Sequence, residues 1–491
     1  MAFAITQTCC ADASCVSVCP VNCIHPTPDE PEFGTTDLLY IDPATCIDCG
    51  ACADACPVDA IFPAGDLTGP LRAYEQLNAD YYAGKDLLAG VPVAPNFHRW
   101  APPSFTRVLP SDFPALDVAV VGTGPAGMYA VEDLLLHTNA RVTLVDRLPV
   151  AGGLIRYGVA PDHPSTKKIG ETFARFHDHP RLRLRLGVPA GPELADRHDA
   201  VIYAVGATDA RRLGVPGEDL PGSLPAATVV GWYNGHPDVA PDAVDLSVER
   251  VVVVGTGNVA LDIARILTAD PEALAETSIA PAALARLRSA KVREVVVLAR
   301  RGPETAAYTR PELQALAARG GLVVDTHDPR VPAAIDGAEP GEKAAWLRGV
   351  PRERVDWPAP PPDGRRIVLR FHSAPLAFGG DTEVRAVVTS GPEGDVEIAT
   401  GRVVRAAGFR GAPVPGLPFD DEAGIVPNES GRVAGRPGVY VAGWIKRGPS
   451  GGIGANKACA RETVGALLED VVAGRLAVRR RGAGARLFGR A

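Results

Sequence analysis

Residues 116–146 read LDVAVVGTGPAGMYAVEDLLLHTNARVTLVD, and this stretch decides the fold. Residues 118–121 have the length and β-branched content of a buried parallel strand, and the strand ends at three spaced glycines, Gly122, Gly124 and Gly127. In a strand–turn–helix unit the first glycine permits a tight turn, the second lets the backbone approach a pyrophosphate, and the third lets the helix pack closely on the strand. The stretch therefore predicts a dinucleotide-binding turn.

The residues around this turn support the same interpretation. A helix over about residues 125–136 would point its free N–H groups and the positive end of its dipole at the phosphates. A second apolar strand, residues 141–145, ends at Asp146, whose carboxylate is placed to accept a hydrogen bond from a ribose hydroxyl. A glycine turn that binds nothing is the alternative, but two strands and an acid in register favour a nucleotide site.

Length and composition limit the class of protein. A chain of 491 residues is expected to form about two to four domains. The sequence has no apolar run of about 18 residues, so we expect no membrane span. Its first ten residues, MAFAITQTCC, lack the basic and apolar regions of a signal peptide, so we expect a cytoplasmic protein. We expect no nucleic-acid partner.

Charge is unevenly distributed along the chain. The net charge is −8, yet residues 1–71 contain ten acids and no Lys or Arg, which leaves 48 acids and 50 bases for the remainder. An acidic N-terminal module attached to a slightly basic body suits electrostatic docking between the two. A merely solvated acidic face is the alternative.

Nine of the ten cysteines lie between positions 9 and 56. In a reducing compartment they are expected to bind metal rather than form disulfides. The run C-x2-C-x2-C-x3-C-P, at Cys46, Cys49, Cys52, Cys56 and Pro57, is typical of iron–sulfur clusters, in which the fourth cysteine commonly binds the other cluster. A partial copy consists of Cys15-x3-Cys19-Pro20, preceded by Cys9 and Cys10.

If each cysteine run supplies its last cysteine to the cluster of the other run, the spacing predicts two clusters. Cluster 2, a [4Fe-4S] cluster, would be held by Cys19, Cys46, Cys49 and Cys52. Cluster 1 would be held by Cys15, Cys56 and one of Cys9 or Cys10. Paired CxxC runs also suit zinc, but the repeated Cys-Pro endings favour iron–sulfur clusters.

The N-terminal region resembles the bacterial two-cluster ferredoxins in its segments CPVNCIH and LLYIDPATCIDCGACADACPVDAIF. In the seven-iron members one cluster is [3Fe-4S] with three protein ligands. The resemblance therefore implies that cluster 1 is [3Fe-4S], held by Cys9, Cys15 and Cys56, with Cys10 possible in place of Cys9 and a second [4Fe-4S] cluster as the alternative. Cys23 matches a family position that usually lies near a cluster without binding it.

A second nucleotide unit begins at VVVVGTGNVALDIARIL, in which Gly255, Gly257 and Ala260 repeat the turn with a small third residue. The next strand, residues 294–298, leads to Arg300 and Arg301, where an NAD site would carry an acid. Guanidinium groups there suit a ribose 2′-phosphate, so we expect NADP(H) rather than NAD. An exposed basic turn is the alternative. Two nested nucleotide units predict a flavoprotein pyridine-nucleotide reductase.

Other glycine-containing segments are expected to complete the flavin site. Close backbone approach to a flat ligand is possible at Gly152 and Gly153, and at Gly206 and Ala207, where the expected strand segment 198–207 ends. Polar groups near the first pair come from Arg156, His163 and Lys167. Near the C-terminus we expect a strand over residues 439–442, a glycine-rich loop over 443–454, and a helix over 455–472 whose N-terminus faces the flavin. Cys459 on this helix is expected to be a packed residue.

From about residue 116 to 472 the chain resembles the adrenodoxin reductase family of ferredoxin–NADP reductases, in the segments GVAPDHP, GWYNG, GTGNVALDIARIL, ARRGP and GWIKRGPSGGI. The fused arrangement is similar to actinobacterial reductases with an N-terminal ferredoxin domain. The resemblance implies that Arg300 and Arg301 hold the 2′-phosphate, that Glu312 contacts NADP near the nicotinamide, and that Trp444 and residues 451–453 line the flavin.

These expectations define the candidate sites. For FAD they are Gly122, Gly124, Pro125, Ala126, Gly127, Asp146, Arg147, Gly153, Leu154, Gly206, Ala207, Gly443, Trp444, Gly451, Gly452 and Ile453. For NADP they are Gly255, Gly257, Asn258, Val259, Ala260, Arg300, Arg301, Glu312 and Gly451. No covalent nucleophile is required, so we expect catalysis by positioning, with Trp444 and Glu312 as positioning residues.

The expected fold is an α/β flavoprotein with two dinucleotide-binding domains, preceded by an α+β ferredoxin domain. In the expected division, residues 1–63 form the ferredoxin domain, 64–114 a strap, and 115–220 the first segment of the FAD-binding domain. Residues 221–370 form the NADP-binding domain with a surface insertion at 328–366, 371–474 the second segment of the FAD-binding domain, and 475–491 a basic tail.

The predicted function is NADPH oxidation with electron transfer through FAD and the clusters to an external ferredoxin or cytochrome-type acceptor. The alternatives are reverse NADP reduction, a flavin subunit of a glutamate-synthase-like complex, and a pure electron carrier.

Overall fold

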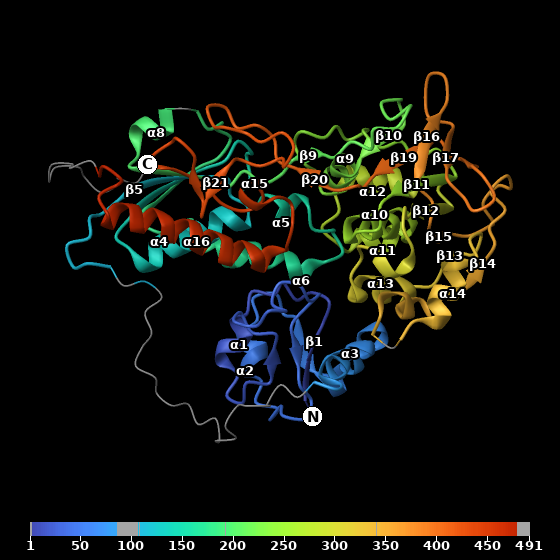
Figure 1. The fold of residues 1–491 in the computed structure, drawn as a ribbon, viewed down its shortest axis with the longest axis horizontal. Helices are drawn as coiled ribbons and strands as arrows, with labels where there is room; N and C mark the ends of the chain where they lie inside the picture. The colour runs from blue at the N-terminus through green and yellow to red at the C-terminus, as the bar shows by residue number, and fades with distance from the viewer. Residues whose placement is uncertain (1, 86–106, 108, 192, 340, 479–491) are drawn as a thin grey trace.

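The protein consists of two α/β domains and a small N-terminal domain (Figure 1). The computed structural model describes residues 2–85, 107, 109–191, 193–339 and 341–478. Residues 86–106 and 108 of the expected strap, and residues 479–491 of the expected basic tail, lie outside the described residues. Two seven-stranded sheets with strand–turn–helix units confirm the predicted fold class of two nucleotide-binding domains.

The N-terminal domain, residues 2–85, is built from short elements around two pairs of antiparallel strands. Strand β1 (Phe3–Ile5) pairs with β4 (Ile61–Pro63), and β2 (Ile24–His25) pairs with β3 (Tyr40–Ile41). The two cysteine runs continue into short helices, α1 (Ser14–Val18) and α2 (Ala51–Ala55). The second half of the domain continues through η1 (Ala64–Asp66), η2 (Gly69–Arg72) and α3 (Ala73–Tyr82).

The expected domain boundary at residue 63 is too early, because α3 packs into the N-terminal domain. Its residue Asn78 is 2 % exposed and accepts from the backbone N–H groups of Ile5 and Ile41, at 3.1 and 2.8 Å. The same amide donates to the carbonyl oxygens of Ile5 and Tyr74, at 2.9 and 2.8 Å. One buried amide thus joins α3 to two strands, and residues 64–85 belong to this domain rather than to a strap.

The first nucleotide domain surrounds the sheet β21-β22-β23-β8-β5-β6-β7. Strands β23, β8, β5, β6 and β7 are parallel. The buried residues of β23, β8, β5 and β6 form near-continuous apolar runs, as a sheet covered on both faces requires, whereas the edge strand β7 alternates leucine with arginine. The strand bounds are β5 Asp117–Val121, β6 Arg141–Val145, β7 Leu182–Arg185, β8 Ala200–Tyr203, β21 Asn428–Glu429, β22 Arg432–Val433 and β23 Val439–Val441.

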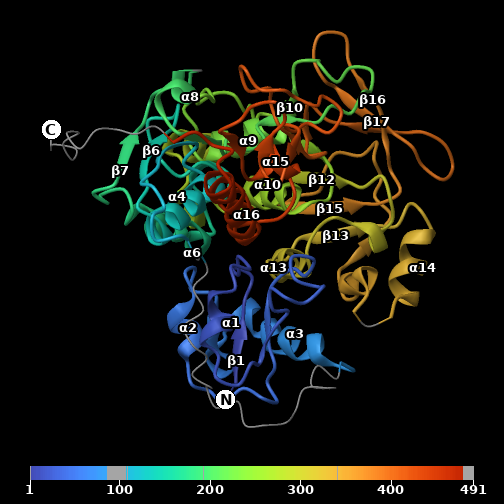
Figure 2. The same ribbon diagram turned by 60° about the vertical axis from the view of Figure 1, so that its left-hand side comes forward.

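Helices α4 (Pro125–His137) and α16 (Ile453–Val472) lie side by side below this sheet (Figures 1 and 2). Helix α4 follows the first glycine turn, and α16 follows the glycine-rich C-terminal loop. The shorter helices of this domain are α5 Leu154–Tyr157, α6 Pro164–Lys167, α7 Ile169–Ala174, α8 Glu193–Arg197 and α15 Trp444–Arg447. The expected glycine-rich loop therefore contains one short helix, α15.

The second nucleotide domain surrounds the parallel sheet β10-β19-β11-β12-β15-β13-β14. Its strands are β10 Ser223–Pro225, β11 Arg250–Val254, β12 Glu294–Leu298, β13 Leu322–Asp325, β14 Arg352–Glu353, β15 Arg366–Arg370 and β19 Arg402–Arg405. The helical elements of this domain are α9 Ala226–Tyr233, α10 Asn258–Thr268, α11 Pro271–Ala275, α12 Pro281–Arg288, η3 Pro303–Thr305, α13 Arg310–Ala318, α14 Arg330–Gly337 and η4 Lys343–Leu347.

Two expected boundaries differ from the structure of the second domain. Strand β19 pairs with β11, so this domain continues past residue 371 to Arg405, after a three-stranded sheet of β16 (Pro375–Gly379), β17 (Ala386–Thr389) and β18 (Val396–Ala399). The segment 328–366 is not a mere surface insertion, because β14 joins the sheet and Leu347 is fully buried.

Two short antiparallel strands, β9 (Asp209–Ala210) and β20 (Phe409–Arg410), lie where the chain passes between the two nucleotide domains. The N-terminal domain lies beneath both, near the beginning of α16 and beside α13 (Figures 1 and 2). Within the described residues of the chain, no helix has the length and apolarity that a membrane crossing requires.

The buried amide of Asn78 yields a stability prediction. Asn78→Ala should lower the stability of the N-terminal domain by about 3 kcal/mol, because backbone groups of β1 and β3 would lose their buried partners. Urea unfolding followed by the visible absorption of the loaded domain measures this change. Gln76→Ala, on the exposed side of the same helix, is the matched control. A loss for Asn78→Ala no larger than for the control would contradict this role.

Candidate functional site

The turn between β5 and α4 has the packing predicted for each glycine. A Cβ at Gly122 would lie 2.4 Å from the carbonyl oxygen of Ala204, and a Cβ at Gly127 would lie 1.9 Å from the carbonyl oxygen of Gly122. A Cβ at Gly124 would meet nothing nearer than 4.0 Å. The first and third glycines are thus required by packing, whereas the second leaves backbone open to a ligand, as a phosphate-binding turn requires.

Asp146 follows β6 at the same edge of the sheet and is 9 % exposed. Its Oδ2 accepts from the N–H of Thr123 at 2.8 Å and from the Thr123 hydroxyl at 2.5 Å, and its Oδ1 accepts from the N–H of Leu148 at 2.9 Å. The acid therefore fixes the glycine turn. The next residue, Arg147, is half-exposed and pairs with Asp238 at 2.5 Å.

The other candidate flavin residues lie at the carboxyl ends of neighbouring parallel strands. A Cβ at Gly153 would lie 2.8 Å from the Cα of Gly124, so Leu154 and α5 begin against the first turn. Gly206 and Ala207 follow β8, and Gly443 and Trp444 follow β23. A Cβ at Gly443 would lie 2.6 Å from the Cβ of Ala126, next to Pro125 at the start of α4.

The loop before α16 completes this edge. The indole Nε1 of Trp444 donates to the carbonyl oxygens of Ser450 and Gly451, at 3.1 and 3.2 Å. Gly452 is the N-cap of α16, and Ile453 is its first residue. The glycine backbone, the open second glycine and the helix N-termini together fit a dinucleotide such as FAD.

The second turn, between β11 and α10, repeats this packing. A Cβ at Gly255 would lie 2.3 Å from the carbonyl oxygen of Ala406, whereas Gly257 faces open space. Asn258 and Val259 begin α10, and Ala260 is fully buried where the helix meets the sheet. Arg300 and Arg301 follow β12, and both are exposed. Neither guanidinium forms an ion pair with a described residue, so both are available to an anion.

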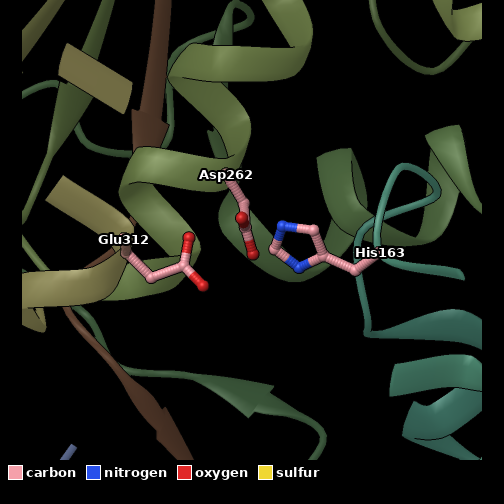
Figure 3. A group of neighbouring side chains, drawn as sticks. All are labelled: His163, Asp262 and Glu312. Carbon is pink, nitrogen blue, oxygen red and sulfur yellow. The ribbon is translucent and has the colours of Figure 1, made fainter. Parts of the chain in front are cut away.

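Three ionisable side chains converge between the two nucleotide domains. His163 lies on the loop before α6, Asp262 on α10, and Glu312 in the first turn of α13, and the three point toward one another (Figure 3). One potential ligand atom from each lies within 4.8 Å of the others. Beside this group, which we call the acid–histidine cluster, Arg265 forms ion pairs with Asp162 and Asp262.

The surroundings of this cluster favour the protonated acid. Burial raises the pKa of Glu312 to about 7, and the negative charges of Asp262 and Asp162 add to this rise. The positive charge of Arg265 opposes it. Burial and the charge of Arg265 lower the pKa of His163. Glu312 can therefore gain or lose a proton near neutral pH.

The cysteines of the N-terminal domain converge on two separate hollows. The first is lined by Cys9, Cys10, Cys15 and Cys56, and the second by Cys19, Cys23, Cys46, Cys49 and Cys52. This is the crossed arrangement predicted from the spacing, in which each run contributes to both groups. Burial raises the pKa of the Cys9 and Cys52 thiols to about 11, so thiolates there need a positively charged core, which iron–sulfur clusters supply.

The first hollow lies against the reductase region of the chain. The N–H of Gly454, in the first turn of α16, donates to the carbonyl oxygen of Cys10 at 2.9 Å. A Cβ at Gly454 would lie 2.3 Å from the carbonyl oxygen of Ala11, so only glycine permits this approach. We call this contact the α16 seam. It joins the loop expected to line the flavin to a residue that lines the first hollow.

Charged pairs surround the α16 seam. The Lys457 ammonium lies 3.7 Å from the Asp12 carboxylate, and Lys168 forms an ion pair with Asp59. In each pair the acid comes from the N-terminal domain and the base from the reductase region. The arrangement supports the expectation that the acidic module docks electrostatically on the rest of the chain.

Sequence reasoning missed two features of this site. Asp262 lies on α10, and its partners His163 and Glu312 are distant in sequence, so no local spacing reveals the group. Arg447, on α15, has a buried Nη2 without a hydrogen-bond partner among the described residues, beside Gly451. An unpartnered buried guanidinium nitrogen fits an anionic ligand at this edge.

Two family models match the chain. Residues 39–62 match the 4Fe-4S binding domain, and residues 116–319 match the pyridine nucleotide-disulphide oxidoreductase family. The first match covers the run Cys46–Cys56, and the second begins just before β5, the strand that leads into the first glycine turn. Fold and site therefore define a pyridine-nucleotide oxidoreductase with an attached iron–sulfur domain.

Relatives and solved structures refine this class. The chain is 45% identical to a probable ferredoxin/ferredoxin–NADP reductase of Mycobacterium tuberculosis, over 97% of this chain and 85% of that one. It is 37% identical to the mitochondrial NADPH:adrenodoxin oxidoreductase of Mus musculus, over 76% of this chain and 82% of that one. The structure of M. tuberculosis FprA in complex with NADPH superposes with a TM-score of 0.67 at 41% identity, over 74% of this chain and 86% of that one.

The chain belongs to the family of ferredoxin–NADP reductases in which a ferredoxin domain is fused to the reductase. This membership confirms the predicted resemblance and the assignment as an oxidoreductase enzyme.

The raised pKa of Glu312 predicts a pH-dependent stability. Between pH 4.5 and about 7, the Glu312 carboxyl is protonated in the folded protein but ionised in the unfolded chain. The free energy of unfolding therefore falls as the pH rises through this range. Glu312→Gln removes this loss. The difference in Tm between the variant and the native protein should therefore be about 2–4 °C larger at pH 8 than at pH 5, in favour of the variant.

Calorimetry at both pH values measures this gain. Glu304→Gln, an exposed acid before α13, is the control and should show the same Tm difference at both. A Tm difference for Glu312→Gln that is independent of pH would contradict the assignment of a raised pKa to Glu312.

Proposed function

We propose that this chain oxidises NADPH and passes the electrons through FAD to its own ferredoxin domain, which delivers them singly to an external ferredoxin or cytochrome-type acceptor. The observation that carries the proposal is the α16 seam. It joins a residue beside the first cysteine hollow directly to the helix whose N-terminus borders the candidate flavin edge, at 2.9 Å between Gly454 N and Cys10 O.

Bound FAD supplies the one chemistry that the side chains lack, because it accepts a hydride and returns electrons one at a time. The chain contributes binding and orientation. The turn after β5, with Gly153, Gly443 and Trp444 beside it, would hold the flavin nucleotide at the carboxyl ends of the parallel strands. No nucleophile is needed, so the catalytic contribution of the protein is positioning.

The second nucleotide domain would hold NADPH. Its open glycine, Gly257, allows backbone approach to the diphosphate, and Arg300 and Arg301 would bind the 2′-phosphate with charge-assisted hydrogen bonds. Glu312 would lie at the nicotinamide end, where the acid–histidine cluster joins the two nucleotide domains. In this arrangement the nicotinamide would lie between the domain that binds NADPH and the domain that binds the flavin.

The two cysteine hollows would hold cluster 1 and cluster 2. We assign Cys9, Cys15 and Cys56 to cluster 1 as a [3Fe-4S] centre, and Cys19, Cys46, Cys49 and Cys52 to cluster 2 as a [4Fe-4S] centre. The lining of the two hollows supports this division. Ligation by free thiolates also favours a reducing compartment, and we infer that the protein acts in the cytoplasm.

The 2′-phosphate assignment predicts a change in cofactor preference. Arg300→Ala should raise the KM for NADPH by about tenfold or more, because a charge-assisted hydrogen bond to the phosphate is lost, and should leave the KM for NADH nearly unchanged. Steady-state kinetics with a soluble dye as acceptor measures both values. Arg286→Ala, an exposed arginine on α12, is the control. Equal effects of Arg300→Ala on both cofactors would remove the assignment.

The cluster assignment predicts the metal content. The loaded protein should contain about seven iron atoms per chain, with an EPR signal in the oxidised state from the three-iron centre. Cys9→Ala should lose that signal and about three iron atoms, whereas Cys10→Ala and the control Cys459→Ala should retain both. Iron and sulfide analysis with EPR tests this. Zinc in place of iron, or a full signal in Cys9→Ala, would overturn the assignment.

A further inference from the structure

A carboxylate of the N-terminal domain caps a helix of the second nucleotide domain. Asp37 lies in the segment between β2 and β3, directly before the buried Leu38 and Leu39. Its Oδ2 accepts from the backbone N–H of Arg310 at 2.8 Å. Arg310 is the first residue of α13, and its N–H has no acceptor within the helix.

Helix α13 does not cap itself. Thr309 is its N-cap residue, but the Thr309 side chain makes no capping hydrogen bond. Instead, the Thr309 N–H donates to Oδ1 of Asn258 at 2.9 Å, and the Thr309 hydroxyl lies 3.2 Å from Nδ2 of the same residue. The beginning of α13 is thus held from one side by the second glycine turn and from the other side by Asp37.

Further contacts with the N-terminal domain surround the same turn. The Arg310 guanidinium lies 3.1 Å from Oδ2 of Asp80 on α3. The hydroxyl of Tyr74, which is 2 % exposed, lies 3.4 Å from the carbonyl oxygen of Pro311, and η2 packs against α13. Within the second nucleotide domain itself, Lys343 of η4 donates to the carbonyl oxygens of Ala306 and Tyr308, at 2.9 and 3.3 Å, and so fixes the loop that leads into the helix.

The turn that Asp37 caps carries Glu312. This residue lies two positions after Arg310, and its carboxyl belongs to the acid–histidine cluster with Asp262 and His163 (Figure 3). An uncapped first turn frays, and fraying would move the Glu312 carboxyl relative to both partners. The contact at Asp37 therefore connects docking of the N-terminal domain to the geometry of a group between the nucleotide domains.

We propose that Asp37 is a positioning residue for NADPH oxidation: by capping α13, the docked ferredoxin domain fixes Glu312 at the nicotinamide end. The inference rests on the proposed function. It makes the ferredoxin domain a structural component of the site that reduces it, in addition to its role as electron acceptor.

The test compares Asp37→Ala with Asp37→Asn in the loaded full-length protein. Loss of a capping acceptor costs a helix about 1 kcal/mol, so Asp37→Ala should increase hydrogen exchange at the first amides of α13 about fivefold. It should lower kcat for NADPH about fivefold and change the KM little, because the arginines that bind the 2′-phosphate are untouched. Asp37→Asn keeps an oxygen acceptor and should restore both values.

Two controls separate positioning from a general loss of structure. Asp29→Ala removes an exposed acid of the same domain and should leave exchange and kcat unchanged, and all three variants should keep the native iron content. In a Glu312→Gln background, Asp37→Ala should lower kcat by less than about twofold, because residues that act through one another are not additive. The proposal would be overturned if Asp37→Ala lowered kcat equally in the native and the Glu312→Gln backgrounds, or if Asp37→Ala and Asp29→Ala changed exchange and kcat equally.

Hydrogen exchange also distinguishes this inference from the proposed function. Exchange at α13 is measured without NADPH and does not depend on any electron transfer. If the native protein failed to oxidise NADPH while Asp37→Ala still exposed α13, the proposed function would fail and the cap would stand. If the native protein oxidised NADPH and exchange at α13 were identical in all variants, the cap would fail alone.

Discussion

The position of the first cysteine hollow beside the nucleotide edge depends on one backbone contact, the hydrogen bond from the N–H of Gly454 to the carbonyl oxygen of Cys10. It forms because Gly454 has no side chain and because α16 presents an unpaired N–H at its beginning. The same helix packs along α4, which follows the first glycine turn. One pair of packed helices therefore fixes the distance between the cysteine hollow and the nucleotide edge.

The polar contacts that surround this seam are individually weak. Lys168–Asp59 and Lys457–Asp12 are at least partly exposed, and such pairs contribute about 0–1 kcal/mol each. Their strength falls with salt, whereas the covalent connection between the domains keeps their effective concentration high.

Local sequence patterns predicted the elements well where their causes are local. The expected strand over residues 118–121 and helix over 125–136 agree with β5 and α4 within one residue at each end, because a glycine turn and an apolar run define both. The crossed cysteine groups also follow from spacing alone. The assignments to individual ligands stay predictions, although the structure brings the predicted residues together at two sheet edges and two hollows.

Long-range features escaped the sequence because their causes lie far apart along the chain. Strand β19 belongs to the second domain through its pairing with β11, about 150 residues earlier, and nothing in its own composition indicates that partner. Asn78 looks like an ordinary helix residue until its bonds to β1 and β3 are seen. The acid–histidine cluster and the cap at Asp37 likewise require the assembled domains.

The central claim is that electrons pass inside one molecule across the α16 seam. Rapid mixing of the loaded protein with excess NADPH, followed by the bleaching of cluster absorption, tests it directly over a tenfold range of protein concentration. Transfer within one chain predicts a first-order rate constant that is independent of protein concentration. A rate constant that rises in proportion to protein concentration would show transfer between molecules and would contradict the account.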